Sequence, residues 1–213
     1  MGYYIRVLAE HAGEIPVTDL RSRLPKDKMR AVITVEEGTE DRWSKLALRH
    51  RDSEDEIAVI ERNVVLPGEL GDEEIKEFIA EVQVGRPKSA ADWLQNYLPK
   101  VNVIYAFQIL NGSDVNDGWK QIHAVFNYLR QRCSGISQAD GEGFSNKDGS
   151  HILWQFSDTA KGLCEMAVLD RTGKWQRFQM DLGDPHQRAA FLEGYVPPGV
   201  QILSGRLLDR SGS

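Results

Sequence analysis

The sequence predicts an α+β fold of mainly antiparallel sheets with helices packed on one face, arranged as two sheet-plus-helix lobes. Three consecutive strand-like runs between Arg30 and Val65 are joined by short polar connections, as in an antiparallel meander. Other runs place apolar residues at the three- and four-residue spacing of an amphipathic helix. Both halves of the chain show the order strand, helix, antiparallel strands, helix. We therefore expect lobes over residues 1–98 and 99–213, with one continuous α+β domain over 1–210 as the alternative.

The first half is expected to contain four strands and three helices. The strands are runs bounded by polar turns, and they are expected over residues 3–9, 30–37, 43–50 and 55–65. The helices are delimited by capping residues, prolines and a glycine, and they are expected over residues 18–24, 72–84 and 90–98. The apolar face of the second helix is formed by Ile75, Phe78, Ile79 and Val82.

The second half begins with the most β-like run of the chain, residues 101–110, which is expected to be a central strand. A long helix over about 116–132 follows, with an apolar stripe formed by Trp119, Ile122, Phe126, Leu129 and Cys133. Further strands are expected over residues 136–144, 150–156, 163–170, 174–182 and 199–208. Asp184, Pro185 and Gln187 predict the start of a last short helix as its cap, first-position proline and third-position glutamine.

The formal charge of −6 is not spread evenly along the chain. Residues 1–98 hold 14 basic and 20 acidic side chains, whereas residues 99–213 hold 12 of each. No polybasic run is present that could neutralise several phosphates, which argues against nucleic acids and anionic membranes as partners. The acidic first half favours a basic protein partner.

No apolar run approaches the roughly 20 residues that span a bilayer, and the first ten residues do not resemble a signal peptide. A cytoplasmic location is therefore expected. The two cysteines, Cys133 and Cys164, lack the spacing of a zinc site or a disulfide framework and are interpreted as buried apolar residues. Neither a metal site nor a cofactor is predicted.

The stretch from Gly135 to Phe156 holds the strongest candidates for chemistry. It matches neither a calcium loop of the EF-hand type nor a phosphate-binding loop. In the simplest interpretation, Asn146 to Gly149 form a hairpin turn and Asp148 is one of its turn residues. Asp140 and Glu142 would then lie on the same face of the incoming strand, roughly 7 Å apart, a separation that acid/base pairs use. A solvated hairpin and a functional carboxylate pair both remain possible interpretations.

Two further residues are candidates for binding. His151 follows the turn and could approach Asp140 across the strands. Trp175 and Phe178 fall on opposite faces of one strand, so one aromatic ring must point away from the main core unless the strand is covered on both sides. An uncovered ring would indicate a lobe interface or a partner site.

The sequence contains no signature of a serine nucleophile, a metal site or a nucleotide site. The first functional hypothesis is therefore a non-enzymatic, soluble binding or regulatory module that acts through a protein partner. The alternative is a small hydrolase or lyase that uses Asp140 and Glu142 as acid and base, helped by His151.

Overall fold

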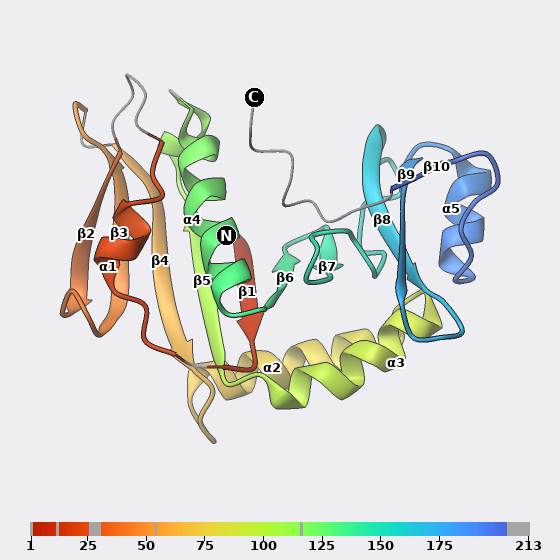
Figure 1. The fold of residues 1–213 in the computed structure, drawn as a ribbon, viewed down its shortest axis with the longest axis horizontal. Helices are drawn as coiled ribbons and strands as arrows, with labels where there is room; N and C mark the ends of the chain where they lie inside the picture. Colours follow the sequence, from red (N-terminus) through yellow and green to blue (C-terminus); the bar gives the residue numbers. More distant parts are fainter. Residues whose placement is uncertain (1, 12, 26–30, 54, 116, 204–213) are drawn as a thin grey trace. The chain divides into compact units, whose positions relative to one another are not determined.

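The computed structural model describes residues 2–11, 13–25, 31–53, 55–115 and 117–203. Within them the chain is α+β and its strand ladders are antiparallel, which confirms the predicted fold class (Figure 1). The chain forms two compact units, each made of two segments. Unit 1 consists of residues 1–73 and 101–135, and unit 2 of residues 74–100 and 136–213. Whether residues 1–98 and 99–213 fold as separate domains stays a prediction.

The strands of unit 1 form a sheet in the order β2-β3-β4-β5-β1. Its strands are β1 (Tyr3–Ala9), β2 (Ala31–Gly38), β3 (Trp43–His50), β4 (Glu56–Val64) and β5 (Val103–Ile109). The pairs β2–β3, β3–β4 and β4–β5 are antiparallel. Strand β1 pairs with the other edge of β5, also antiparallel, with Tyr3 opposite Ile109. The predicted meander and the central position of β5 are therefore confirmed.

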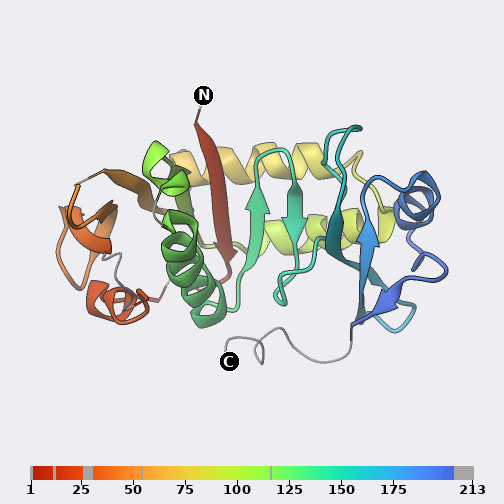
Figure 2. The same cartoon turned by 90° about the horizontal axis from the view of Figure 1, so that it is seen from above.

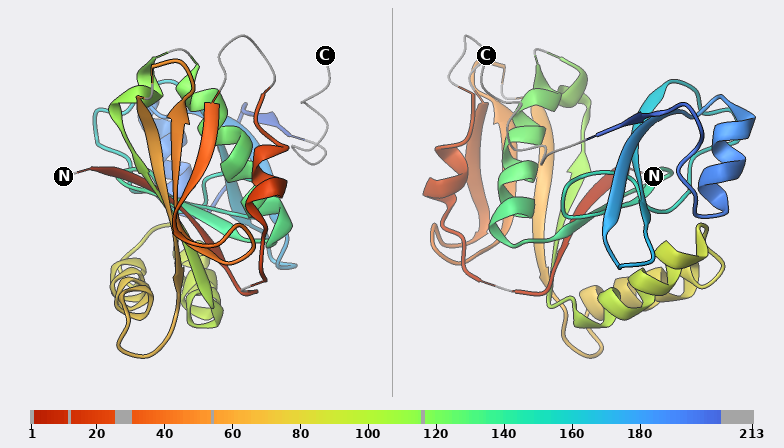
Figure 3. Two further views of the ribbon diagram at one scale, coloured as in Figure 1. Left: turned by 90° about the vertical axis from the view of Figure 1, so that its left-hand side faces the viewer. Right: turned by 45° about the vertical axis from the view of Figure 1, so that its right-hand side comes forward.

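The helices of unit 1, α1 (Val17–Arg21) and α4 (Gly118–Arg132), lie on the same side of this sheet (Figure 3). The contact is carried by aromatic and aliphatic side chains, such as Phe126 of α4, whose ring lies 5.4 Å from that of Phe107 in β5. Ile122 and Leu129, two members of the predicted apolar stripe, are fully buried. A short 3₁₀ turn, η2 (Asn111–Asp114), connects β5 to α4.

Unit 2 contains most of α2 (Leu70–Val82), together with α3 (Lys88–Tyr97), the 3₁₀ turn η1 (Leu98–Lys100) and α5 (Pro185–Leu192). Its strands form the pair β6 (Ile136–Ala139) and β7 (Gly143–Ser145), and a three-stranded sheet in the order β10-β9-β8. The bounds of this second sheet are β8 (Leu163–Leu169), β9 (Trp175–Asp181) and β10 (Gln201–Ile202). The part of the predicted last strand beyond residue 203 lies outside the described residues.

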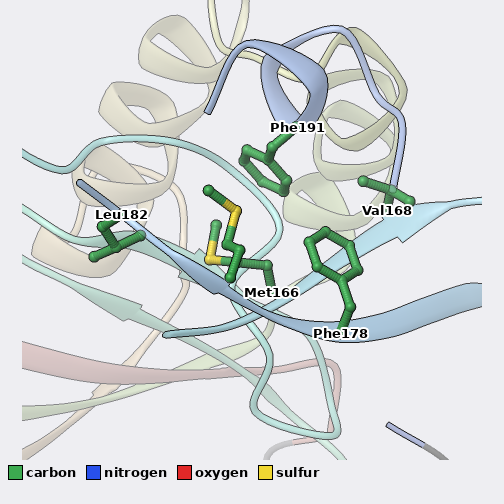
Figure 4. Packing of buried hydrophobic residues seen from close by; sticks show 6 residues of the cluster. Met166, Val168, Phe178, Leu182 and Phe191 are labelled. Carbon is green, nitrogen blue, oxygen red and sulfur yellow. The ribbon is translucent and has the colours of Figure 1, made fainter. Parts of the chain in front are cut away.

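The core of unit 2 lies between the three-stranded sheet and α5, which lie beside each other in Figure 2. Buried side chains from β8, from β9 and the residue that follows it, and from α5 meet there: Met166, Val168, Phe178, Met180, Leu182 and Phe191. Figure 4 shows Met166 and Phe178 directed from the strands toward Phe191 of α5. The opposite face of β9 is also covered, because Trp175 packs edge-on against Trp93 of α3 with ring centroids 5.3 Å apart. Coverage on both sides explains why this strand carries aromatic residues on both faces.

Two predictions for the segment from 136 to 156 were wrong. The run 136–144 is not one strand, because Asp140, Gly141 and Glu142 form a turn between β6 and β7. Gly141 has φ 72° and supplies the left-handed conformation that this turn requires. Residues 150–156 do not form a strand either. Ile152 and Leu153 are both fully buried, and such consecutive burial is incompatible with the alternation of a half-exposed strand.

Candidate functional site: an acidic pocket in unit 1

A pocket of about 810 Å³ lies in unit 1 where the ends of β1, β4 and β5 meet η2. It has an acidic part, an apolar part and one aromatic ring. Its principal lining side chains are Tyr3, Asp55, Glu56, Ile109, Asn111 and Val115. None of the described residues that line it is a lysine or an arginine.

The wall formed by η2 depends on glycine. A Cβ atom on Gly112 would lie 2.5 Å from the carbonyl oxygen of Glu56, so a side chain at this position cannot fit without backbone movement. A Cβ atom on Gly118, at the start of α4, would in turn lie 2.4 Å from the carbonyl oxygen of Gly112. The two glycines therefore allow β4, η2 and α4 to approach one another closely at the pocket.

Hydrogen bonds hold the same wall in place. The backbone N–H of Leu110 donates to the carbonyl of Ile57 at 3.0 Å. Nε2 of the buried His50 lies 2.9 Å from the carbonyl oxygen of Gly112. Because a carbonyl oxygen can only accept, Nε2 of His50 must carry the proton in this contact. The side chain of His50, from the end of β3, thus fixes η2 against the sheet.

The apolar side of the pocket combines strand and loop residues. Tyr3 and Ile109 are directly opposite in the β1–β5 ladder, so their side chains share one face. The ring of Tyr3 packs edge-on against Trp119 of α4, with centroids 6.3 Å apart. Val115 leaves 45% of its surface exposed. The pocket therefore offers apolar surface and an aromatic ring that is held by a neighbour.

The acidic side is formed by Asp55 and Glu56 at the start of β4. Glu56 accepts a hydrogen bond at 2.9 Å from Nη2 of Arg49, and the same nitrogen donates to Glu36 at 2.9 Å. The hydrogen bond that Arg49 donates to Glu56 is the main reason why the pKa of Arg49 is raised above its ordinary value. Neither the Asp55 carboxylate nor the Asn111 amide has a hydrogen-bond partner among the described residues. These two groups can therefore bind a ligand without breaking an existing contact.

The residues that the sequence singled out all belong to unit 2, and none of them lines this pocket. Asp140 and Glu142 lie in the β6–β7 turn and not on one face of a strand, so that part of the prediction was wrong. Asp148 lies in the turn predicted over Asn146 to Gly149, where its N–H donates to Oδ1 of Asn146 at 3.0 Å. Trp175 and Trp93 are both half-buried, and their rings pack edge-on against each other in unit 2.

His151 forms single bridges to both β7 and β8. Its Nδ1 lies 3.3 Å from the Ser145 hydroxyl, and its ring packs edge-on against Phe156. Burial lowers the pKa of His151, and the carboxylate of Glu142 partly opposes this effect. His151 therefore lies in the electrostatic range of Glu142. Its predicted approach to Asp140 stays a prediction.

Other kinds of site find no support in the part of the chain that the structure describes. No group of three or more histidine, cysteine and acidic side chains there could hold a metal ion. Burial raises the pKa of the Cys164 thiol to about 12, with further contributions from Glu142 and Glu165, so this thiol is unreactive at neutral pH. Among the described residues, no helix is both long and apolar enough to cross a bilayer.

Fold and site together define an α+β protein with an acidic, partly apolar pocket at one end of an antiparallel sheet. Comparison of the chain with protein-family models, curated proteins and solved structures finds no match.

Proposed function

We propose that the protein is a non-enzymatic binding module that acts through a basic protein partner, and that the unit 1 pocket is where the partner docks. One observation carries this proposal: Asp55 and Glu56 line a pocket whose described lining contains no basic side chain. A cationic group entering the pocket would be attracted by the Asp55 carboxylate and by Glu56, whose charge is already partly balanced by Arg49.

The charge of unit 1 supports the same proposal. Its two segments hold 18 acidic and 14 basic residues, so the unit carries a formal charge of −4, against −2 for unit 2 with 14 acidic and 12 basic residues. Such a surface attracts a basic partner during encounter and repels phosphate groups. A cytoplasmic location, without nucleic acid or membrane as partner, belongs to the same proposal.

The test is partner binding by a pocket variant. Asp55→Asn keeps the size of the side chain and removes one charge, and we expect it to weaken binding roughly five- to tenfold. Partners retained on immobilised wild-type protein would be identified, purified and titrated by calorimetry against both proteins. Raising the salt concentration to about 0.5 M should weaken wild-type binding, because salt screens partly exposed charges.

Asp41→Asn is the matched control. Asp41 is exposed in the turn between β2 and β3 and does not line the pocket, so this variant has the same net charge as Asp55→Asn. Equal loss of binding in both variants would show a non-specific charge effect and contradict docking at the pocket. If no purified basic protein binds the wild type stoichiometrically, the proposed function is wrong.

A second candidate function, a small hydrolase or lyase, is favoured by the neighbourhood of His151. Burial lowers the pKa of this imidazole and so favours its neutral form, its Nδ1 contacts the Ser145 hydroxyl, and Glu142 is close enough to influence its pKa. A neutral imidazole beside a hydroxyl and a carboxylate is one arrangement used for general acid/base chemistry. In this candidate Asp140 and Glu142 act as acid and base, with His151 assisting.

A hydrolytic activity would be sought with a panel of chromogenic ester and glycoside substrates. Under this second candidate, Glu142→Gln and Asp140→Asn should each lower turnover at least about 100-fold, while Asp41→Asn leaves it unchanged. Turnover that survives both carboxylate substitutions would exclude this pair as the acid and base. The absence of any turnover by the wild type would leave the binding function as the only candidate.

A further inference from the structure

We propose that the unit 1 pocket recognises the guanidinium group of an arginine, presented by a short segment of the partner. This inference rests on the proposed function and names the chemical group that the pocket selects. It follows from the acceptors in the pocket, from its apolar wall and from its size.

The acceptors in the pocket suit a group with several N–H donors. Asp55 offers a carboxylate and Asn111 an amide oxygen, neither of which is used by another described residue. A guanidinium presents five donors in a planar fork and can bind a carboxylate through two parallel hydrogen bonds. An ammonium group is a compact point charge and does not match this arrangement.

Glu56 already binds one guanidinium at the edge of the pocket. Nε and Nη2 of Arg49 both point to Oε1 of Glu56, at 3.3 and 2.9 Å, while Nη2 also reaches Glu36. This contact occupies Oε1 of Glu56, and no described residue donates to Oε2. An incoming guanidinium can therefore bind Asp55 and still reach the second oxygen of Glu56.

The apolar wall favours the same group. The methylene stem of an arginine can lie along Ile109 and Val115, and its planar head can stack on the ring of Tyr3. Trp119 supports that ring from the side of α4, so little conformational freedom is lost when it is covered. Lysine loses more on entering such a site, because its ammonium group is more strongly hydrated than a guanidinium.

The size of the pocket shows how much of the partner enters. The pocket is open to solvent, since Asp55, Glu56, Asn111 and Val115 are all exposed, and its volume of about 810 Å³ is that of a groove and not of an enclosed cavity. A single side chain does not fill such a volume. We therefore place the arginine together with its neighbouring backbone in the pocket, as a short peptide segment.

The test uses three labelled alanine-based peptides that differ at one central position, which is arginine, lysine or citrulline. Citrulline has nearly the shape of arginine but no charge. Fluorescence anisotropy should show that the arginine peptide binds about tenfold more tightly than the lysine peptide. The citrulline peptide should show no measurable binding. Asp55→Asn should remove the preference for arginine, and Asp41→Asn should retain it.

A second variant tests the pocket without removing an acidic residue. Val115→Lys places a competing cation in the lining, at a side chain that is already 45% exposed, so folding should be unaffected. We expect it to abolish binding of the arginine peptide. Val84→Lys is the matched control, because it adds the same charge at a residue that is 87% exposed and does not line the pocket.

The outcomes separate the inference from the proposed function. Equal affinity for the arginine and lysine peptides would overturn guanidinium recognition and leave a general cation-binding pocket. If no peptide binds but a purified basic partner still does, the inference fails while the binding function stands. If neither the peptides nor any basic protein bind, both are wrong.

Discussion

Replacing Phe178 with alanine is expected to lower the free energy of unfolding of unit 2 by about 3–5 kcal/mol, the range for removing a large aromatic side chain from a packed core. Phe178 is fully buried, and its ring lies 6.4 Å from that of Phe191, which α5 supplies from the other side of the core. The substitution removes the contacts of both rings and leaves a cavity that the surrounding strands can only partly fill.

Urea unfolding monitored by circular dichroism measures this effect, and hydrogen exchange locates it. The protection of backbone amides against hydrogen exchange should fall in β8, β9 and α5 and remain unchanged in β3, β4 and β5. Leu163→Ala is the control on the same sheet, because Leu163 is 71% exposed and its truncation should change the free energy of unfolding by less than about 0.5 kcal/mol. Similar losses in the two variants would mean that Phe178 is not part of the core of unit 2.

Local signals explain the parts of the fold that the sequence predicted well. At the start of α5, Oδ1 of Asp184 accepts hydrogen bonds from the N–H groups of His186 and Gln187, and Pro185 occupies the first turn. All of these residues lie within four positions of one another, so the pattern is visible without knowledge of the fold. The start of α3 was predicted less well. The helix begins at Lys88 and not at residue 90, its N-terminal cap is Pro87, and no side chain bonds the first turn.

The loop from 136 to 149 shows what a local pattern leaves open. Both Asp140–Glu142 and Asn146–Gly149 have turn composition, but a hairpin turn was predicted only at the second. The structure uses both, because Gly141 and Gly149 each adopt a positive φ, at 72° and 89°. With two turns in succession, the carboxylates of the candidate pair lie in a turn, where the alternation of strand faces no longer applies.

The pocket could not be predicted because its parts are distant in the sequence. Asp55 and Glu56 begin the run 55–65, which is predicted as a strand and carries no sequence signal of a site. They meet Asn111 and Val115 only because β4 and β5 pair with Ala58 opposite Ile109. The requirement for glycine at position 112 likewise arises from the backbone of Glu56, which is 56 positions earlier. Only the excess of acidic residues in the first half pointed toward this part of the molecule.

Replacing Gly112 with alanine is expected to destabilise unit 1 by about 1–3 kcal/mol, the usual cost of forcing extra volume into a packed site. The new Cβ atom would lie 2.5 Å from the carbonyl oxygen and 2.9 Å from the carbonyl carbon of Glu56, both of which are backbone atoms that cannot rotate away. The turn η2 must therefore move off β4. This movement lengthens the 2.9 Å hydrogen bond from His50 to Gly112 and displaces Asn111 and Val115 from the pocket.

The same substitution should therefore reduce binding of the arginine peptide at least about tenfold, since it disturbs both an acceptor and the apolar wall. Chemical unfolding and fluorescence anisotropy would be measured on the same protein at a temperature where the variant remains folded. Gly13→Ala is the control, because a Cβ atom there meets nothing within 4 Å. The prediction fails if Gly112→Ala leaves both the free energy of unfolding and the affinity for the arginine peptide unchanged. The close contact between η2 and β4 would then not shape the pocket.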